Sequence, residues 1–213
     1  MKIIDLALPM GKGMPVFPGT DPCDISWSHT IAKNGFRMGH ITLNSHAGTH
    51  CDAPEHFLEN APGIEHWGLE RCVGEARVLD FSCKKPREEI TRADLLPYER
   101  YIVPGARLLL RTDWDKHIGD GDSYFHDYPG ISVEAAEWLA EKKIGMVGVD
   151  AASMNDVHGT EVHRTFLGND VLIVESLANL RDIPTDTIFF VAAPLNFKEA
   201  DGMSVRAMGI IFE

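Results

Sequence analysis

Residues 46–56 read His46-Ala-Gly-Thr-His50-Cys-Asp52-Ala-Pro-Glu-His56. Four side chains in this stretch can bind a metal ion or move a proton, and all four stand at even-numbered positions. Alternate residues of an extended strand face the same side. The parity therefore predicts that His46, His50, Asp52 and His56 share one pocket.

The spacing of the first two histidines requires a bend in that strand. Four strand residues span about 13 Å at about 3.3 Å each, whereas a Zn–N bond is only about 2.0–2.1 Å long. Gly48 lies midway between His46 and His50, and glycine permits such a bend. A helix would also place both histidines on one face, but Gly48, Thr49 and Pro54 disfavour a helix here.

The chemistry of the four side chains favours a metal site. Two imidazoles and one carboxylate, from His46, His50 and Asp52, suit Zn, Mn or Fe and leave open positions for water. Asp52 can bridge two ions through its two oxygens. His56 is either a further ligand or a general acid/base. A lone histidine in a strand is usually a packed or surface residue, but three histidines and an aspartate within eleven residues predict a metal centre.

Composition limits the class of protein. The chain has 213 residues, which predicts a single domain over residues 1–213. A formal net charge of −12 argues against nucleic acid or an anionic membrane as partner, which leaves a small-molecule substrate. Four cysteines without a C-x-x-C pair, and no signal-like or transmembrane stretch, predict a cytoplasmic protein with reduced thiols.

Hydrophobic patterns and turn residues predict a chain made mostly of strands, with two helices. The Asn34-Gly35 dipeptide predicts a hairpin, and Thr91 and Ser132 predict the starts of two helices. The expected strands cover residues 2–8, 23–31, 36–44, 73–81, 107–112, 144–149, 170–175, 187–193 and 205–212. The expected helices cover residues 91–98 and 132–143, and loops are expected over 9–22, 113–129 and 154–164, with a turn at Gly202.

A second ion would need ligands from elsewhere in the chain. Glu175 ends an apolar strand, where a carboxylate is costly unless it is paired or bound to metal. His158 and His163 are both candidates, and spacing cannot choose between them. Asp150 also ends a strand and has either a functional role or a role in a turn. Phe17 lies between prolines and packs either on the core or as a wall of a substrate pocket.

The chain resembles the cyclase family of metal-dependent hydrolases, which includes bacterial kynurenine formamidase and isatin hydrolase. Residues 46–56 match the signature H-x-G-[AT]-H-x-D-[AS]-P-x-H of that family. Weaker similarities extend over most of the chain: Ile4-Asp5-Leu6, Met14-Pro15-Val16-Phe17-Pro18-Gly19, Gly130-Ile131-Ser132, Val147-Gly148-Val149-Asp150, His163-Arg164, Glu175-Ser176-Leu177 and Met203-Ser204-Val205-Arg206-Ala207.

The resemblance implies a fold and a division of roles. The fold would be a mixed α/β fold of the swivelling β/β/α type, with a central mixed β-sheet and flanking helices. One ion would be bound by His46, His50 and Asp52. A second would be bound by Asp52, His163 and Glu175, which selects His163 over His158. His56 would be the general acid/base, and the family's members assemble as homodimers or homotetramers.

The resemblance also implies a reaction. The protein would cleave an amide C–N bond, in an aryl formamide such as N-formylkynurenine or in a cyclic amide, with metal-bound hydroxide. The cofactor would be two Zn ions, with Mn or Fe as alternatives. Phe17 stands where kynurenine formamidases of this family carry Trp, and it would form an aromatic wall for the substrate.

Two other functions remain open at this point. His46, His50 and Asp52 could form the facial triad of a mononuclear iron oxygenase, or the site could belong to a metal-binding protein without catalytic activity. Serine-hydrolase chemistry lacks its G-x-S-x-G motif.

Overall fold

The computed structural model describes residues 1–212 and is built on one large mixed sheet. The sheet has nine strands in the order β1-β13-β11-β5-β7-β9-β10-β4-β12. Its strands are β1 (Lys2–Asp5), β4 (His50–Asp52), β5 (Val73–Asp80), β7 (Arg107–Arg111), β9 (Met146–Val149), β10 (Leu172–Glu175), β11 (Thr187–Val191), β12 (Gly202–Ser204) and β13 (Met208–Ile211). The predicted mixed α/β fold is therefore confirmed.

The centre of the sheet is parallel and its edges are antiparallel. Strands β5, β7, β9 and β10 run parallel to one another, while β11 and β4 pair antiparallel with the two outer strands of this group, β5 and β10. The apolar runs Leu108–Leu110 and Met146–Val149 are buried completely, as expected for strands covered on both faces. This packing fixes the central strands of the sheet, and with them the end of β10 that lies next to β4.

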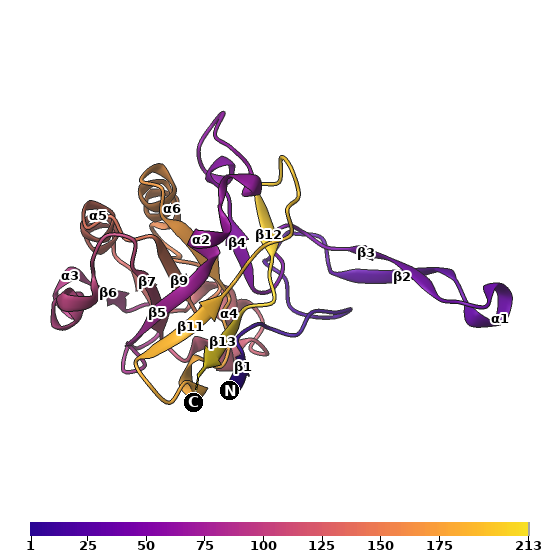
Figure 1. Ribbon diagram of the computed structural model, residues 1–213, viewed down its shortest axis with the longest axis horizontal. Coiled ribbons are helices and arrows are strands. Elements are labelled where there is room, and N and C mark those ends of the chain that lie inside the picture. Colours follow the sequence, from indigo (N-terminus) through magenta and orange to yellow (C-terminus); the bar gives the residue numbers. More distant parts are fainter. Residues whose placement is uncertain (213) are drawn as a thin grey trace.

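Helices flank this sheet (Figure 1). They are α2 (Leu69–Cys72), α3 (Arg92–Leu95), α4 (Asp122–His126), α5 (Val133–Glu141) and α6 (Gly159–Gly168), whereas the short helix α1 (Ile31–Asn34) lies away from the sheet. Both predicted caps are present: Ser132 accepts a hydrogen bond from the Ala135 amide, and Thr91 forms a capping box with Asp94. No helix among residues 1–212 is long and apolar enough to cross a bilayer.

Two predicted loops contain helices. The segment 154–164 was expected to be a loop, but α6 begins at Gly159 and carries His163 on its buried face with Val162, Phe166 and Leu167. The helical pattern was hidden because a buried histidine counts as polar in the sequence. In the same way, α4 interrupts the expected loop 113–129 and buries Tyr124 and Phe125.

The predicted hairpin forms an arm that leaves the body of the molecule. Its strands are β2 (Asp24–His29) and β3 (Met38–Thr42), and Figure 1 shows them projecting on the side opposite to α3, α5 and α6. The tip of the hairpin lies at the predicted Asn34-Gly35 dipeptide. The short helix α1 forms there and ends at Gly35, whose φ of 79° is left-handed. A separate short pair, β6 (Glu89–Ile90) and β8 (Gly130–Ile131), completes the strands.

Candidate metal centre

The segment 46–56 brings its four polar side chains together, but as a bent chain rather than a strand. Only His50–Asp52 is extended, as β4, while His46 lies in the preceding turn and His56 ends the 3-10 helix η1 (Pro54–His56). Gly48 has a φ of 62° and supplies the predicted bend. The expected bent strand does not continue to His56, because Pro54 starts a helical turn directly after β4.

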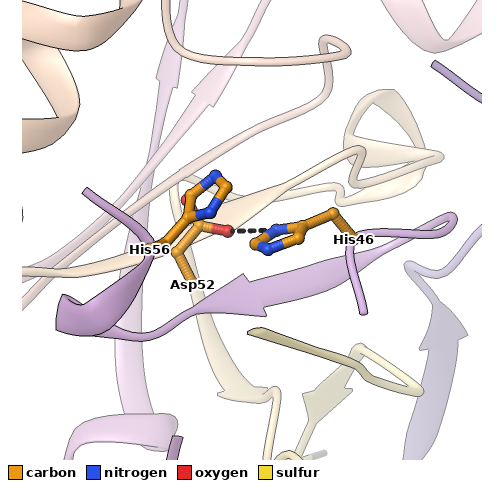
Figure 2. Close-up of side chains that lie close together, drawn as sticks. All are labelled: His46, Asp52 and His56. Atoms are coloured by element: carbon orange, nitrogen blue, oxygen red, sulfur yellow. Dashed lines mark hydrogen bonds and ion pairs between the residues drawn. The ribbon is translucent and has the colours of Figure 1, made fainter. Parts of the chain in front are cut away.

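The first half of the site is centred on Asp52. The Nδ1 atom of His46 lies 3.1 Å from Oδ1 of Asp52, and Nε2 of His50 lies 3.3 Å from the same oxygen. The rings of His46 and His56 stack with centroids 3.9 Å apart. Figure 2 shows His46, Asp52 and His56 pointing toward one another, with the His46–Asp52 contact as a dashed line.

The second half reaches the same carboxylate from two other elements. Glu175 ends β10 directly opposite His50 in the sheet, and its Oε2 lies 3.4 Å from His50 Nε2. His163 comes from α6, with its Nε2 3.0 Å from Glu175 Oε1 and 3.5 Å from Asp52 Oδ2. His158 is exposed and lines a different surface pocket. The fold therefore brings His163, and not His158, to the cluster.

The buried charges shift one another's pKa values. Burial alone would lower the pKa of His50, but its contacts with Asp52 and Glu175 raise it to about 10. The same balance between burial and Glu175 raises the pKa of His163 to about 9. Burial and Asp52 raise the pKa of Glu175, yet His163 and His50 together lower it to about 2. Both carboxylates are thus held ionised, ready to bind a cation.

One buried atom tests whether a metal ion fits. Within residues 1–212, Oδ2 of Asp52 is buried and has no hydrogen-bond partner, which normally costs stability. It lies among imidazole nitrogens and carboxylate oxygens, a donor set that suits Zn, Mn or Fe. These residues therefore fit a divalent ion.

The cluster forms the floor of a cavity of about 630 Å³. Its aromatic wall includes Phe57, Tyr124, Phe125 and Phe17. Phe17 is half exposed and packs edge-on against Phe125, with ring centroids 5.7 Å apart. Of the two alternatives for Phe17, its position favours the pocket wall.

For Asp150, the structure favours the role in a turn over a role in the site. Its carboxylate is fully buried away from the cavity lining and accepts hydrogen bonds from the amides of Thr112 and Asp113 and from the Thr112 hydroxyl. It therefore holds the turn after β7.

Sequence reasoning missed two polar residues of the site. Ser153 donates a hydrogen bond to Oε1 of Glu175 at 2.9 Å, and Asp201 lies 3.0 Å from Nε2 of His46. Asp201 also precedes β12, which the sequence predicted as a turn at Gly202. No motif marks Asp201, because only the pairing of β12 with β4 brings it to His46, which lies 155 positions earlier in the chain.

Comparison with known proteins identifies the family of this chain. The model of the Cyclase family matches residues 4–156. The chain is a member of the cyclase family. A kynurenine formamidase of Bacillus thuringiensis subspecies konkukian is 30% identical over 210 residues, covering 96% of this chain and 95% of the relative.

Solved structures agree with this membership. A potential metal-dependent hydrolase with cyclase activity is 28% identical, with a TM-score of 0.81 over 100% of this chain and 98% of that one. Isatin hydrolase A from Labrenzia aggregata, bound to benzyl benzoate, is 25% identical, with a TM-score of 0.87 over 100% and 94% of the two chains. The predicted class, a metal-dependent hydrolase of non-peptide C–N bonds, is confirmed at this level.

Proposed function

We propose that this cyclase-family protein hydrolyses the amide C–N bond of an aryl formamide or a cyclic aryl amide. The observation that carries the proposal is the convergence of five ligand-type side chains on Asp52, whose buried Oδ2 has no hydrogen-bond partner within residues 1–212. This cluster lies at the floor of an aromatic cavity, which is the arrangement a metal-dependent hydrolase of aryl substrates requires.

The proposed ligands form two sets that share Asp52. His46, His50 and Asp52 would hold one ion, and Asp52, His163 and Glu175 would hold a second. When bound, such ions polarise a substrate carbonyl and lower the pKa of water toward about 7. Zn is the proposed metal, with Mn and Fe as alternatives that the same ligands accept.

His56 is proposed as the general acid/base. Its ring lines the cavity beside His46, and burial lowers its pKa, which favours the neutral imidazole that accepts a proton. It would take a proton from the attacking water and return it to the leaving nitrogen. An aryl amine leaves more readily than an alkyl amine, which fits an aryl substrate.

The aromatic wall and the named relatives narrow the substrate class. Phe17 and Phe125 offer ring faces and edges to a planar aryl group. The names of the relatives point to N-formylkynurenine and isatin as the first compounds to test.

The experiment measures hydrolysis of N-formylkynurenine, isatin and formanilide by three preparations: the purified protein, the protein after chelation, and the chelated protein reloaded with Zn or Mn. We expect activity that is lost on chelation and restored by metal. Full activity in the chelated protein would contradict the proposal. Turnover that requires oxygen would favour the iron oxygenase, and metal binding without any hydrolysis would favour a non-catalytic role.

We also propose that the protein is a homodimer or homotetramer held by the arm. An isolated two-stranded hairpin is marginally stable in water, yet this one projects from the body of the molecule (Figure 1). It exposes large apolar side chains along its length. These residues are Ile25, Trp27, Ile31, Phe36, Met38 and Ile41. A second copy would cover them and, by two-fold symmetry, would have its own arm covered in return.

We propose a cytoplasmic location because the cysteine thiols are unpaired. All four cysteines are free, and Cys23, Cys51 and Cys72 are buried. Unpaired cysteines are typical of reducing compartments.

A further inference from the structure

The histidines proposed as metal ligands share one arrangement of their two ring nitrogens. In each ring, one nitrogen faces the buried carboxylates of Asp52 or Glu175. The other nitrogen lies within hydrogen-bond distance of an oxygen outside that cluster. The Nδ1 atoms of His50 and His163 lie 2.8 Å and 2.6 Å from the carbonyl oxygens of Gly48 and Gly159. Because a carbonyl only accepts, Nδ1 keeps its proton, and Nε2 is the nitrogen that can give up its proton and offer a lone pair to a metal ion.

His46 follows the same arrangement with a different outer partner. Its Nδ1 faces Oδ1 of Asp52 at 3.1 Å, and its Nε2 lies 3.0 Å from Oδ2 of Asp201. Both nitrogens of this ring face carboxylates. If a metal ion took the place of the proton on Nδ1, the remaining proton would stay on Nε2 and be donated to Asp201. Outer partners of this kind fix the orientation and the tautomer of a ligand histidine.

Asp201 also reaches the proposed general acid/base. The same Oδ2 lies 3.6 Å from Nδ1 of His56, whose ring stacks on His46. A hydrogen bond that is long without ligands can tighten in the working complex. The carboxylate of Asp201 therefore lies beside the rings of both His46 and His56.

Asp201 is itself fixed from two sides. The hydroxyl of Ser45 donates to its Oδ1 at 2.8 Å, and the amide of Ala53 donates to its backbone carbonyl at 2.9 Å. The next residue, Gly202, is paired with Asp52 across β12 and β4. The pairing of β12 with β4 therefore positions both the Asp201 carboxylate and Asp52.

We propose that Asp201 is a positioning residue: it holds His46 in the tautomer that presents Nδ1 to a metal ion, and it orients the stacked ring of His56. The role rests on the proposed metal site and not on the identity of the substrate.

The test measures the affinity of metal-free protein for Zn²⁺ and Mn²⁺ by competition with a chelating dye. We compare wild type, Asp201→Ala, Asp201→Asn and a control, Asp120→Ala. Asp120 pairs with the exposed His117, which lies outside the cluster. Loss of an outer partner typically weakens metal binding about 10–100-fold, so we expect that loss for Asp201→Ala and none for the control.

The asparagine variant separates positioning from folding. Its amide oxygen can accept from Nε2 of His46, and the hydroxyl of Ser45 can turn to accept from its amide group. Asp201→Asn should therefore recover most of the metal affinity. The melting temperatures of all four metal-free proteins should agree closely, which a merely structural role of Asp201 would not allow.

The outcomes separate this role from the proposed function. Equal metal affinity of wild type and Asp201→Ala would overturn the role of Asp201 alone, as would an asparagine variant no better than the alanine variant. A wild-type protein that binds neither ion would contradict the proposed function, and the role of Asp201 with it.

Discussion

His56 is the residue on which the proposed proton transfers depend. His56→Ala should reduce the rate of amide hydrolysis about 10²–10⁴-fold, the range usual for loss of a general acid/base. Metal content should stay unchanged, because the five proposed ligands are intact. The control His66→Ala removes a surface histidine that pairs with Asp170 and should keep full activity. Activity that survives His56→Ala would show that another group moves the proton.

Gly202 provides a second residue-scale prediction. A Cβ atom at this position would lie 2.5 Å from Cε1 of His46, so the ring must leave its present position beside Asp52 and Asp201. Gly202→Ala should therefore lower both metal affinity and activity. Gly119→Ala is the control, since no atom lies within 4 Å of its Cβ position. Unchanged metal binding in Gly202→Ala would argue against His46 as a ligand.

The sequence predicted the site better at this scale than at any other. The ligand-type residues of segment 46–56 follow from their parity and from Gly48, because local spacing decides which side chains can meet. Glu175 follows from a carboxylate at the end of an apolar strand. Spacing alone did not choose His163 over His158. Asp201 and Ser153 were not predictable, because pairings between distant segments bring them to the cluster.

At the scale of elements, Asp94 stabilises the start of α3. It accepts hydrogen bonds from the Thr91 amide and hydroxyl and from Lys84. Burial raises its pKa, but these bonds outweigh burial and lower the pKa to about 2. The stabilisation is therefore complete above the unfolded pKa of about 4 and is lost as the pH falls toward 2.

Asp94→Asn tests this contribution by thermal unfolding. At pH 7 the free energy of unfolding of the variant should fall by about 1 kcal/mol, the usual contribution of a helix cap. The Tm should then fall by about 2–4 °C. The difference from wild type should shrink between pH 4 and pH 2. Glu137→Gln, on the exposed face of α5, is the control. A difference that is constant with pH would assign the effect to something other than the carboxylate charge.

The capped helices and apolar strands were predictable because their signals are local. The caps at Thr91 and Ser132 and the strand 107–112 were all found within a residue or two. Helix α6 was missed because its buried face includes His163, which the fold buries only by pairing it with Glu175. A helix that carries a buried polar site residue is thus hard to predict from polarity alone.

At the scale of the whole molecule, the arm should control assembly. Substituting Ile25, Phe36 and Ile41 together by Ser removes exposed apolar groups of the arm without touching the cavity. We expect the variant to shift toward monomer in light scattering at a concentration where wild type is oligomeric. Val157→Ser, an exposed apolar residue elsewhere, is the control. A monomeric wild type, or a triple variant that keeps its oligomeric state, would contradict assembly through the arm.

The central claim is a metal centre of two halves that meet at Asp52. The most direct test is elemental analysis of metal per chain for wild type, Glu175→Ala and the surface control Glu161→Ala, each assayed with N-formylkynurenine and isatin. We predict two ions per chain in wild type and in the control, falling to one or none in Glu175→Ala with loss of hydrolysis. One ion per chain in all three proteins would contradict the role of Glu175 and leave a site with a single metal ion.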